Sequence, residues 1–276
     1  MTPGTLIAIG GAENTGPNAD VLGRFVRLCG GAPDAPHGRL IVVPTASQRP
    51  ESGPEYADVF YRLGAAHVDV LAIDQRSQAE QADVLAAVDA ADGVFFTGGD
   101  QLRLSSLLGG TALTERLRSR RDAGLHIAGT SAGAAFLSEH MIAYGRGGHT
   151  PKRGMMQLTP GLGVLRRAIV DQHFRQRDRI GRLIAALAHN PRPVGLGVDE
   201  DTAVAVGPDD VLEVWGRGAV TVVDGATMRH TSAAHAKRSD PLCVIGLQLH
   251  VLTAGAHYDL RHRRAYAPGE DLGAPR

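Results

Sequence analysis

The stretch HIAGTSAGAAF, residues 126–136, runs from an apolar segment through Gly-Thr-Ser-Ala-Gly into an alanine-rich segment. A G-x-S-x-G pattern between an apolar strand and a helix is typical of a nucleophile elbow, where a sharp turn lifts a serine hydroxyl clear of the sheet. We therefore expect Ser131 to be a nucleophile. The N–H of Ala132, at the start of the helix, is expected to be one oxyanion donor. A glycine-rich junction that serves only packing would give the same pattern.

Short apolar runs also occur at residues 5–11, 39–46, 67–73 and 93–99. They alternate with segments of helical spacing, such as the one that contains Val21, Phe25 and Leu28. This alternation of doubly apolar strands with helices predicts an α/β fold with a parallel sheet flanked by helices. Ligands of such sheets bind beyond the carboxyl ends of the strands, and Ser131 falls at such an end.

The sequence changes in character from about residue 193, where strand-like segments are linked by short turns. We find no Pro- or Ser-rich linker and no repeat. The prediction is a single α/β domain over residues 1–257 with a β-rich C-terminal part from about 193. Residues 258–276 hold Arg, Pro and Gly with little periodicity, and are predicted to be a loose tail.

A second oxyanion donor is expected from the segment GVFFTGGDQLRL, residues 93–104. Gly98 and Gly99 follow a buried strand, and consecutive glycines let backbone N–H groups approach an oxyanion closely. Asp100 is expected to cap the next helix. Gln101, taken alone, fits a solvated residue of the first helical turn.

Twelve histidines compete for the role of general base. His173 ends a short strand at which a helix is expected to begin, so it would meet a strand-end serine at the same edge of the sheet. His140 and His149 follow Ser131 more closely in the sequence. The acid that orients the base stays open at this point between Asp171, Asp199, Glu200 and Asp201.

Arginines follow His173 at helical spacing. Arg175, Arg179 and Arg182 would share one face of the expected helix, with Arg177 at the edge of the apolar stripe. A solvated face is the ordinary explanation, but arginines beside a catalytic histidine would also bind carboxylates through bidentate hydrogen bonds. The two residues before the histidine, Asp171 and Gln172, could recognise a cationic or amide group.

The composition excludes several classes of protein. The chain has 276 residues with 29 Lys+Arg and 29 Asp+Glu, so it lacks the basic surplus of a general nucleic-acid-binding protein. No apolar run approaches the length of a membrane span. The absence of a basic region at the N-terminus and the presence of only two cysteines predict a cytoplasmic location. No metal-ligand pattern occurs, and no cofactor is expected.

Five segments together resemble the cyanophycinase family, serine peptidases related to aspartyl dipeptidase. They are IGGAE (9–13), FFTGGDQLRL (95–104), AGTSAGAA (128–135), VDQHFRQRDRIGRL (170–183) and GLGVDEDTA (195–203), in the order and spacing of the family. The resemblance implies a flavodoxin-like fold, also described as class I glutamine-amidotransferase-like. It also implies a homodimer.

The resemblance implies roles for single residues. Ser131 would be the nucleophile, His173 the base and Glu200 the acid. The N–H groups of Gly99 and Ala132 would hold the oxyanion. The substrate pocket would contain the following residues: Gln101, Asp171, Gln172, Arg177, Arg179 and Arg182.

The implied activity is exo-type hydrolysis of cyanophycin, a polyaspartate whose side chains carry arginine, to β-Asp-Arg dipeptides through an acyl-enzyme on Ser131. An alternative is an aspartyl dipeptidase or another β-aspartyl peptide hydrolase of the same fold. Several arginines favour the polymer, because a dipeptidase needs one carboxylate clamp. A catalytically silent binding protein is the non-enzymatic alternative. A glutamine amidotransferase would need cysteine in place of Ser131.

Overall fold

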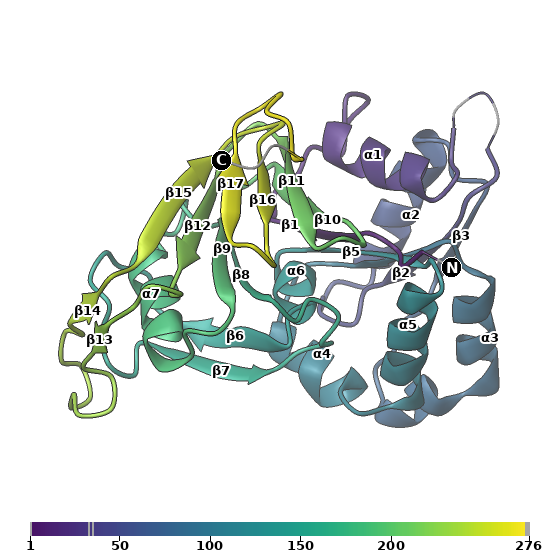
Figure 1. Cartoon of the computed structure of the whole chain (residues 1–276). Helices are drawn as coiled ribbons and strands as arrows, with labels where there is room; N and C mark the ends of the chain where they lie inside the picture. Colours follow the sequence, from purple (N-terminus) through teal and green to yellow (C-terminus); the bar gives the residue numbers. More distant parts are fainter. Residues whose placement is uncertain (1, 33, 35, 274–276) are drawn as a thin grey trace.

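The computed structural model describes residues 2–32, 34 and 36–273. Its main sheet has nine strands in the order β17-β16-β11-β10-β1-β5-β4-β2-β3 (Figure 1). Five neighbouring strands are parallel: β1 (Leu6–Ile9), β5 (His126–Thr130), β4 (Gly93–Phe96), β2 (Arg39–Val43) and β3 (His67–Val70). Four more extend the sheet in antiparallel fashion: β10 (Thr202–Val206), β11 (Val211–Gly216), β16 (His257–Asp259) and β17 (Arg264–Tyr266).

Helices cover both faces of the parallel strands because alternate side chains are apolar on both sides. Ile7 and Ile9 pack in a core with α1 (Asp20–Leu28) and α2 (Ser52–Arg62). Leu6 and Ala8 point into a second core, which includes α3 (Ala82–Ala90), α4 (Gln101–Leu108), α5 (Ala112–Asp122) and α6 (Ala132–Phe136). A 3₁₀ helix, η1 (Arg76–Glu80), precedes α3. Figure 1 shows these two groups of helices above and below the sheet.

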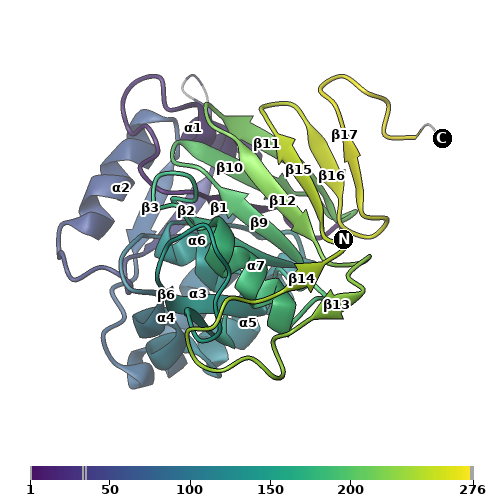
Figure 2. The same cartoon turned by 90° about the vertical axis from the view of Figure 1, so that its left-hand side faces the viewer.

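A second sheet of four strands lies beside the first. Its order is β15 (Gln248–Leu252), β12 (Val220–Asp224), β9 (Val194–Val198) and β8 (Ala168–Gln172), and only β8 and β9 are parallel among these pairs. The helix α7 (Ile180–His189) packs on it, and the two sheets meet along β10, β9 and β12 (Figure 2). Two hairpins complete the chain: β6 (His140–Gly145) with β7 (Met156–Pro160), and β13 (His230–Thr231) with β14 (Val244–Ile245).

The predicted α/β class with a β-rich C-terminal part is confirmed, and β9 begins at Val194, next to the expected change at residue 193. The prediction of a loose tail from residue 258 is wrong for residues 258–266, which contribute β16 and β17 to the main sheet. The Tyr258 side chain is fully buried, and its hydroxyl donates to Asp224 Oδ2 at 2.9 Å. Three-residue strands are too short to show periodicity in the sequence. Residues 274–276 of the predicted tail lie outside the described residues.

Among the residues 2–32, 34 and 36–273, no helix combines the length and the apolar character that a bilayer crossing requires.

Candidate active site

Ser131 lies in the turn between β5 and α6, with φ 51° and ψ −111°. This region is sparsely populated by L-residues and is the strained geometry expected of a nucleophile elbow. A Cβ on Gly129 would lie 2.4 Å from the carbonyl carbon of Gly133, and one on Gly133 would lie 2.4 Å from Phe96 O. Both glycines are therefore required for packing α6 on the sheet. The G-x-S-x-G pattern thus serves packing and also forms the strained turn that presents Ser131.

His173 follows β8 and faces the serine. Its Nε2 lies 2.9 Å from Ser131 Oγ, and its Nδ1 lies 2.6 Å from Glu200 Oε1. The backbone N–H of His173 donates to Gly10 O at 2.7 Å. Gly11 has φ +95°, and a Cβ there would lie 2.4 Å from the imidazole ring. The glycines after β1 thus leave room for the histidine between serine and carboxylate.

Burial lowers the pKa of His173, the hydrogen bond that His173 donates to Glu200 opposes that effect, and the positive charge of Arg177 lowers the pKa further. The imidazole is therefore neutral at neutral pH. With the proton on Nδ1, donated to Glu200, the Nε2 atom is free to accept the proton of Ser131.

The other open carboxylates are engaged elsewhere. Asp199 accepts the backbone N–H groups of Arg175 at 3.0 Å and Ala219 at 3.2 Å. Asp201 accepts the N–H of Asn14 at 2.8 Å. Asp171 is paired with arginines that follow it. Glu200 is the carboxylate of this group that contacts the imidazole.

The predicted oxyanion donors flank Ser131. A Cβ on Gly98 would lie 3.3 Å from the Cβ of Ser131, so the Gly98–Gly99 turn runs directly beside the nucleophile. Gly99 has φ +141°, and a Cβ there would lie 2.1 Å from Ala46 O, which leaves no space for a side chain. Within the described part of the chain, neither the Gly99 N–H nor the Ala132 N–H donates to a protein acceptor. Asp100 caps α4 by accepting the Leu102 N–H at 2.8 Å.

The model of peptidase family S51 matches residues 6–214, a range that contains Ser131, His173 and Glu200. The chain belongs to peptidase family S51. The chain is 41% identical over 264 residues to a protein of Trichormus variabilis named cyanophycinase, covering 95% of this chain and 87% of the relative. It is 43% identical over 260 residues to a cyanophycinase of Thermosynechococcus vestitus, covering 94% and 80%.

The fold of the S51 chain also matches a solved structure, a peptidase from an acI-B1 actinobacterium. The TM-score is 0.66 at 24% sequence identity, covering 94% of this chain and 97% of the other. The resemblance to cyanophycinases and the expectation of a serine-type peptidase are thereby confirmed.

The prediction that Arg175, Arg179 and Arg182 share one face of a helix is wrong for Arg175. The helix α7 begins at Ile180, not at His173, because His173 and Asp178 adopt positive φ values of 46° and 51°. Arg175 therefore lies in the preceding turn, where its exposed side chain reaches Asp199 Oδ2 at 3.5 Å. It does not join Arg179 and Arg182.

Arg179 and Arg182 form a buried cluster with Asp171. Arg182 Nε donates to Asp171 Oδ2 at 2.7 Å, and its Nη2 donates to Asp171 Oδ1. Arg179 Nη1 donates to Gln172 Oε1 at 2.8 Å and to Asp171 Oδ1 at 3.3 Å. Burial lowers the pKa of Arg179 to about 10, and Asp171 opposes that effect. Arg177 is exposed, and the described residues provide no acidic partner for it.

Gln101 is half-buried and does not behave as a solvated residue. Its Nε2 donates to the backbone carbonyls of Ile142 at 3.1 Å and Ala143 at 2.6 Å. It therefore ties the start of α4, beside the Gly98–Gly99 turn, to strand β6.

A feature that sequence reasoning missed is a buried glutamate behind the elbow. Glu13 is 7% exposed, and its carboxylate accepts the hydroxyl hydrogens of Thr130 at 2.6 Å and Tyr56 at 2.5 Å. Burial and the Glu13 charge raise the pKa of Tyr56. Tyr56 also lines a hollow of about 610 Å³ that reaches Gly98 and Gly99. The only signal in the sequence was the place of Glu13 in the IGGAE segment.

The described residues contain no group of three or more His, Cys, Asp or Glu side chains arranged to hold a metal ion.

Proposed function

We propose that this S51 peptidase is a serine exopeptidase that hydrolyses cyanophycin, multi-L-arginyl-poly-L-aspartate, and releases β-Asp-Arg dipeptides. The observation that carries the proposal is the hydrogen-bonded line from Ser131 through His173 to Glu200, at 2.9 and 2.6 Å, with arginines beside it. Relatives named cyanophycinase, which are 41–43% identical to the chain over 260–264 residues, support the choice of substrate.

The reaction starts when Ser131 Oγ attacks a backbone aspartyl carbonyl and His173 Nε2 takes the hydroxyl proton. The N–H groups of Gly99 and Ala132 hold the oxyanion of the tetrahedral intermediate. His173 then gives its proton to the leaving amine, and an acyl-enzyme remains. A water molecule, deprotonated by His173, attacks the ester, and the dipeptide leaves as Ser131 regains its proton. Glu200 keeps the Nδ1 proton in place and stabilises the imidazolium in both steps.

The charges beside the serine suit this substrate. Each repeat of cyanophycin carries a free α-carboxylate and a guanidinium on its arginine. Arg177 is exposed and available for the carboxylate. Arg179 and Arg182 extend the positive region, although Asp171 neutralises part of it. Guanidinium groups hold carboxylates through paired hydrogen bonds.

The pocket residues divide into contact and positioning roles. Both oxygens of Asp171 accept from arginines, so we assign Asp171 the positioning of Arg179 and Arg182. The Gln172 Oε1 atom is taken by Arg179, which leaves its Nε2 amide for a substrate carbonyl. Gln101 is assigned the positioning of the oxyanion turn, through its hydrogen bonds to β6.

Incubation of the purified protein with cyanophycin, followed by mass analysis of the products, tests this function. β-Asp-Arg is the expected product. Cleavage of simple α-Asp dipeptides without release of β-Asp-Arg would show an aspartyl dipeptidase instead. The dipeptidase alternative is not favoured, because the relatives with 41–43% identity over 260–264 residues are named cyanophycinase. A silent binding protein is not favoured, because the serine, the base and the acid are hydrogen-bonded in sequence.

We also propose that the protein is a cytoplasmic homodimer. Free thiols at Cys29 and Cys243 fit a reducing compartment. The edge strand β15 exposes Leu249 and Val251 by 55% and 62%, and these side chains offer an apolar face to a second copy. Light scattering should give twice the chain mass for the wild type and a lower mass for Val251→Glu. A monomeric wild type would contradict the dimer.

A further inference from the structure

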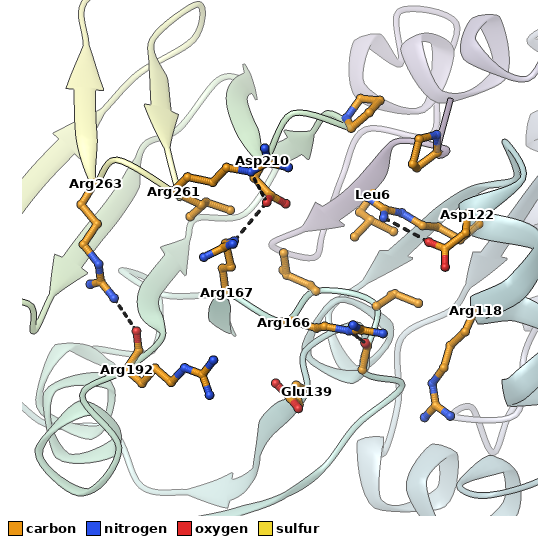
Figure 3. Close-up of a pocket in the computed structure, with 17 residues that line it drawn as sticks. Leu6, Arg118, Asp122, Glu139, Arg166, Arg167, Arg192, Asp210, Arg261 and Arg263 are labelled. Atoms are coloured by element: carbon orange, nitrogen blue, oxygen red, sulfur yellow. Dashed lines mark hydrogen bonds and ion pairs between the residues drawn. The ribbon is translucent and has the colours of Figure 1, made fainter. Parts of the chain in front are cut away.

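A second polar hollow lies at the edge of the main sheet opposite Ser131. It is lined by residues at the amino ends of strands, including Leu6 of β1, Arg167 before β8 and Arg192 before β9, and has a volume of about 710 Å³ (Figure 3). Ser131 lies at the carboxyl end of β5, which is parallel to β1. The hollow is therefore separate from the candidate active site.

Positive charge dominates this hollow. Seven arginines and three carboxylates line it. Arg167 and Arg261 share the carboxylate of Asp210, with Nε–Oδ2 distances of 3.0 and 2.8 Å. Arg166 and Arg192 have no acidic partner among the described residues, and both are exposed. The hollow thus holds two guanidinium groups with free hydrogen-bond donors.

A carboxylate without a partner lies among these arginines. The Glu139 side chain is exposed and makes no hydrogen bond or ion pair within the described part of the chain. In the view of Figure 3 it is drawn between Arg192 and Arg166. Its backbone is fixed, since its N–H donates to Leu165 O at 3.0 Å. Free cationic and anionic groups therefore line one concave surface.

Arginine is abundant in this chain, so the number of arginines in the hollow does not by itself indicate a binding site. The concave arrangement matters because a hollow lined mainly by one sign of charge concentrates ligands of the opposite sign. Guanidinium groups without acidic partners bind oxyanions in bidentate fashion. The free glutamate beside them favours a ligand that carries a cation next to its anion over a simple anion.

We propose that this hollow is a second binding site for cyanophycin, in which Arg166 and Arg192 bind α-carboxylates of the polymer and Glu139 binds a neighbouring guanidinium. The identity of the polymer rests on the proposed function. Because every repeat presents the same two charges, a polymer can occupy this hollow while a chain end occupies the active site. Such a second contact raises the effective concentration of chain ends at Ser131 without any change in the reaction.

The test measures binding of cyanophycin to the protein in a Ser131→Ala background, so that no cleavage occurs. Arg166→Ala/Arg192→Ala is compared with Arg229→Ala/Arg238→Ala, which removes the same charge from exposed arginines outside the hollow. We expect about a tenfold loss of affinity for the first pair and less than about twofold for the second. In the active enzyme, kcat/KM on a two-repeat β-Asp-Arg oligomer should stay within about twofold, because so short a substrate cannot reach both sites.

Equal losses in both double variants would overturn the inference, since they would show unspecific attraction. A changed mass of the Arg166/Arg192 variant in light scattering would also overturn it and reveal a subunit interface. Displacement of the polymer from the hollow by inorganic phosphate, but not by succinate at equal ionic strength, would identify a phosphate site instead. If the hollow binds cyanophycin but the wild type does not cleave it, only the proposed function fails. If the wild type cleaves cyanophycin and the hollow does not bind it, only this inference fails.

Discussion

At the scale of single residues, the acid of the proposed triad rests on one contact, the 2.6 Å hydrogen bond between Glu200 Oε1 and His173 Nδ1. The carboxylate fixes the tautomer and stabilises the imidazolium that forms during the reaction. The neighbouring Asp201 instead accepts the backbone N–H of Asn14. Two adjacent carboxylates therefore have different roles.

Glu200→Gln should lower kcat on cyanophycin by about 10³–10⁴-fold with little change in KM, because the amide no longer supports the imidazolium. Asp201→Asn is the matched control and should keep kcat within about tenfold. Steady-state kinetics of the two variants check this assignment. A larger loss for Asp201→Asn than for Glu200→Gln would transfer the role to Asp201.

The pH dependence of the reaction follows from His173, whose pKa is lowered by burial and by Arg177. His173 acts as a base only when neutral, so kcat/KM should be constant near pH 7 and fall on acidification with an apparent pKa below 6.5. Arg177→Gln removes a positive charge that disfavours the imidazolium, so this acidic limb should move to higher pH. A pH–rate profile of both proteins measures the shift. A wild-type limb above pH 7, or an unmoved limb in the variant, would contradict this account.

The residue scale also shows what the sequence could predict. Ser131, His173, Gly99 and Ala132 were expected at strand ends, where a local pattern places them, and the structure brings them together. Glu200, Asp199 and Asp201 have different hydrogen-bond partners, and these partners depend on a turn that packs against segments distant in the sequence. Charge and spacing alone do not distinguish these three carboxylates or Asp171, and only the family resemblance favours Glu200.

At the scale of elements, the connection from β8 to α7 combines a turn with a buried ion cluster. The Arg182 and Asp171 side chains are 4% and 1% exposed. Ion pairs this deeply buried are costly to break, because the remaining charge is left without compensation. The sequence predicted a continuous helix here, since positive φ values at His173 and Asp178 leave no trace in the periodicity.

Arg182→Met should lower the free energy of unfolding by about 3–5 kcal/mol, because Asp171 would remain buried without its main partner. Arg175→Met provides the control, since the Arg175 side chain is 77% exposed and its pair with Asp199 should contribute at most about 1 kcal/mol. Chemical denaturation followed by circular dichroism compares the two. Similar losses in both variants would show that burial of the cluster contributes little.

At the scale of the whole molecule, two sheets share the C-terminal half of the chain. The parallel part of the main sheet was predictable, because each strand and its helix are close in the sequence. The antiparallel pairing of β10 with β1 joins residues about two hundred positions apart, and no local pattern indicates it. β16 pairs with β11 across about 45 positions and with β17 in a hairpin, and together they extend the edge of the sheet where a tail was expected. The pairing of β10 with β1 helps to place Glu200, in the turn between β9 and β10, next to His173.

This architecture gives the molecule two distinct edges. The carboxyl ends of β5 and β8 carry Ser131 and His173, and the amino ends of β1, β8 and β9 border the arginine-lined hollow. An enzyme that works on a polymer can use both edges at once, one for the reaction and one for retention.

Release of β-Asp-Arg from cyanophycin, followed by mass analysis with wild type and Ser131→Ala side by side, decides whether Ser131 is the nucleophile of a cyanophycin-degrading peptidase. We expect β-Asp-Arg as the main product of the wild type and a loss of about 10⁵–10⁶-fold in the rate for Ser131→Ala, because the nucleophile is removed while the fold is kept. Undiminished release of the dipeptide by Ser131→Ala, or a wild type that releases none, would contradict this assignment.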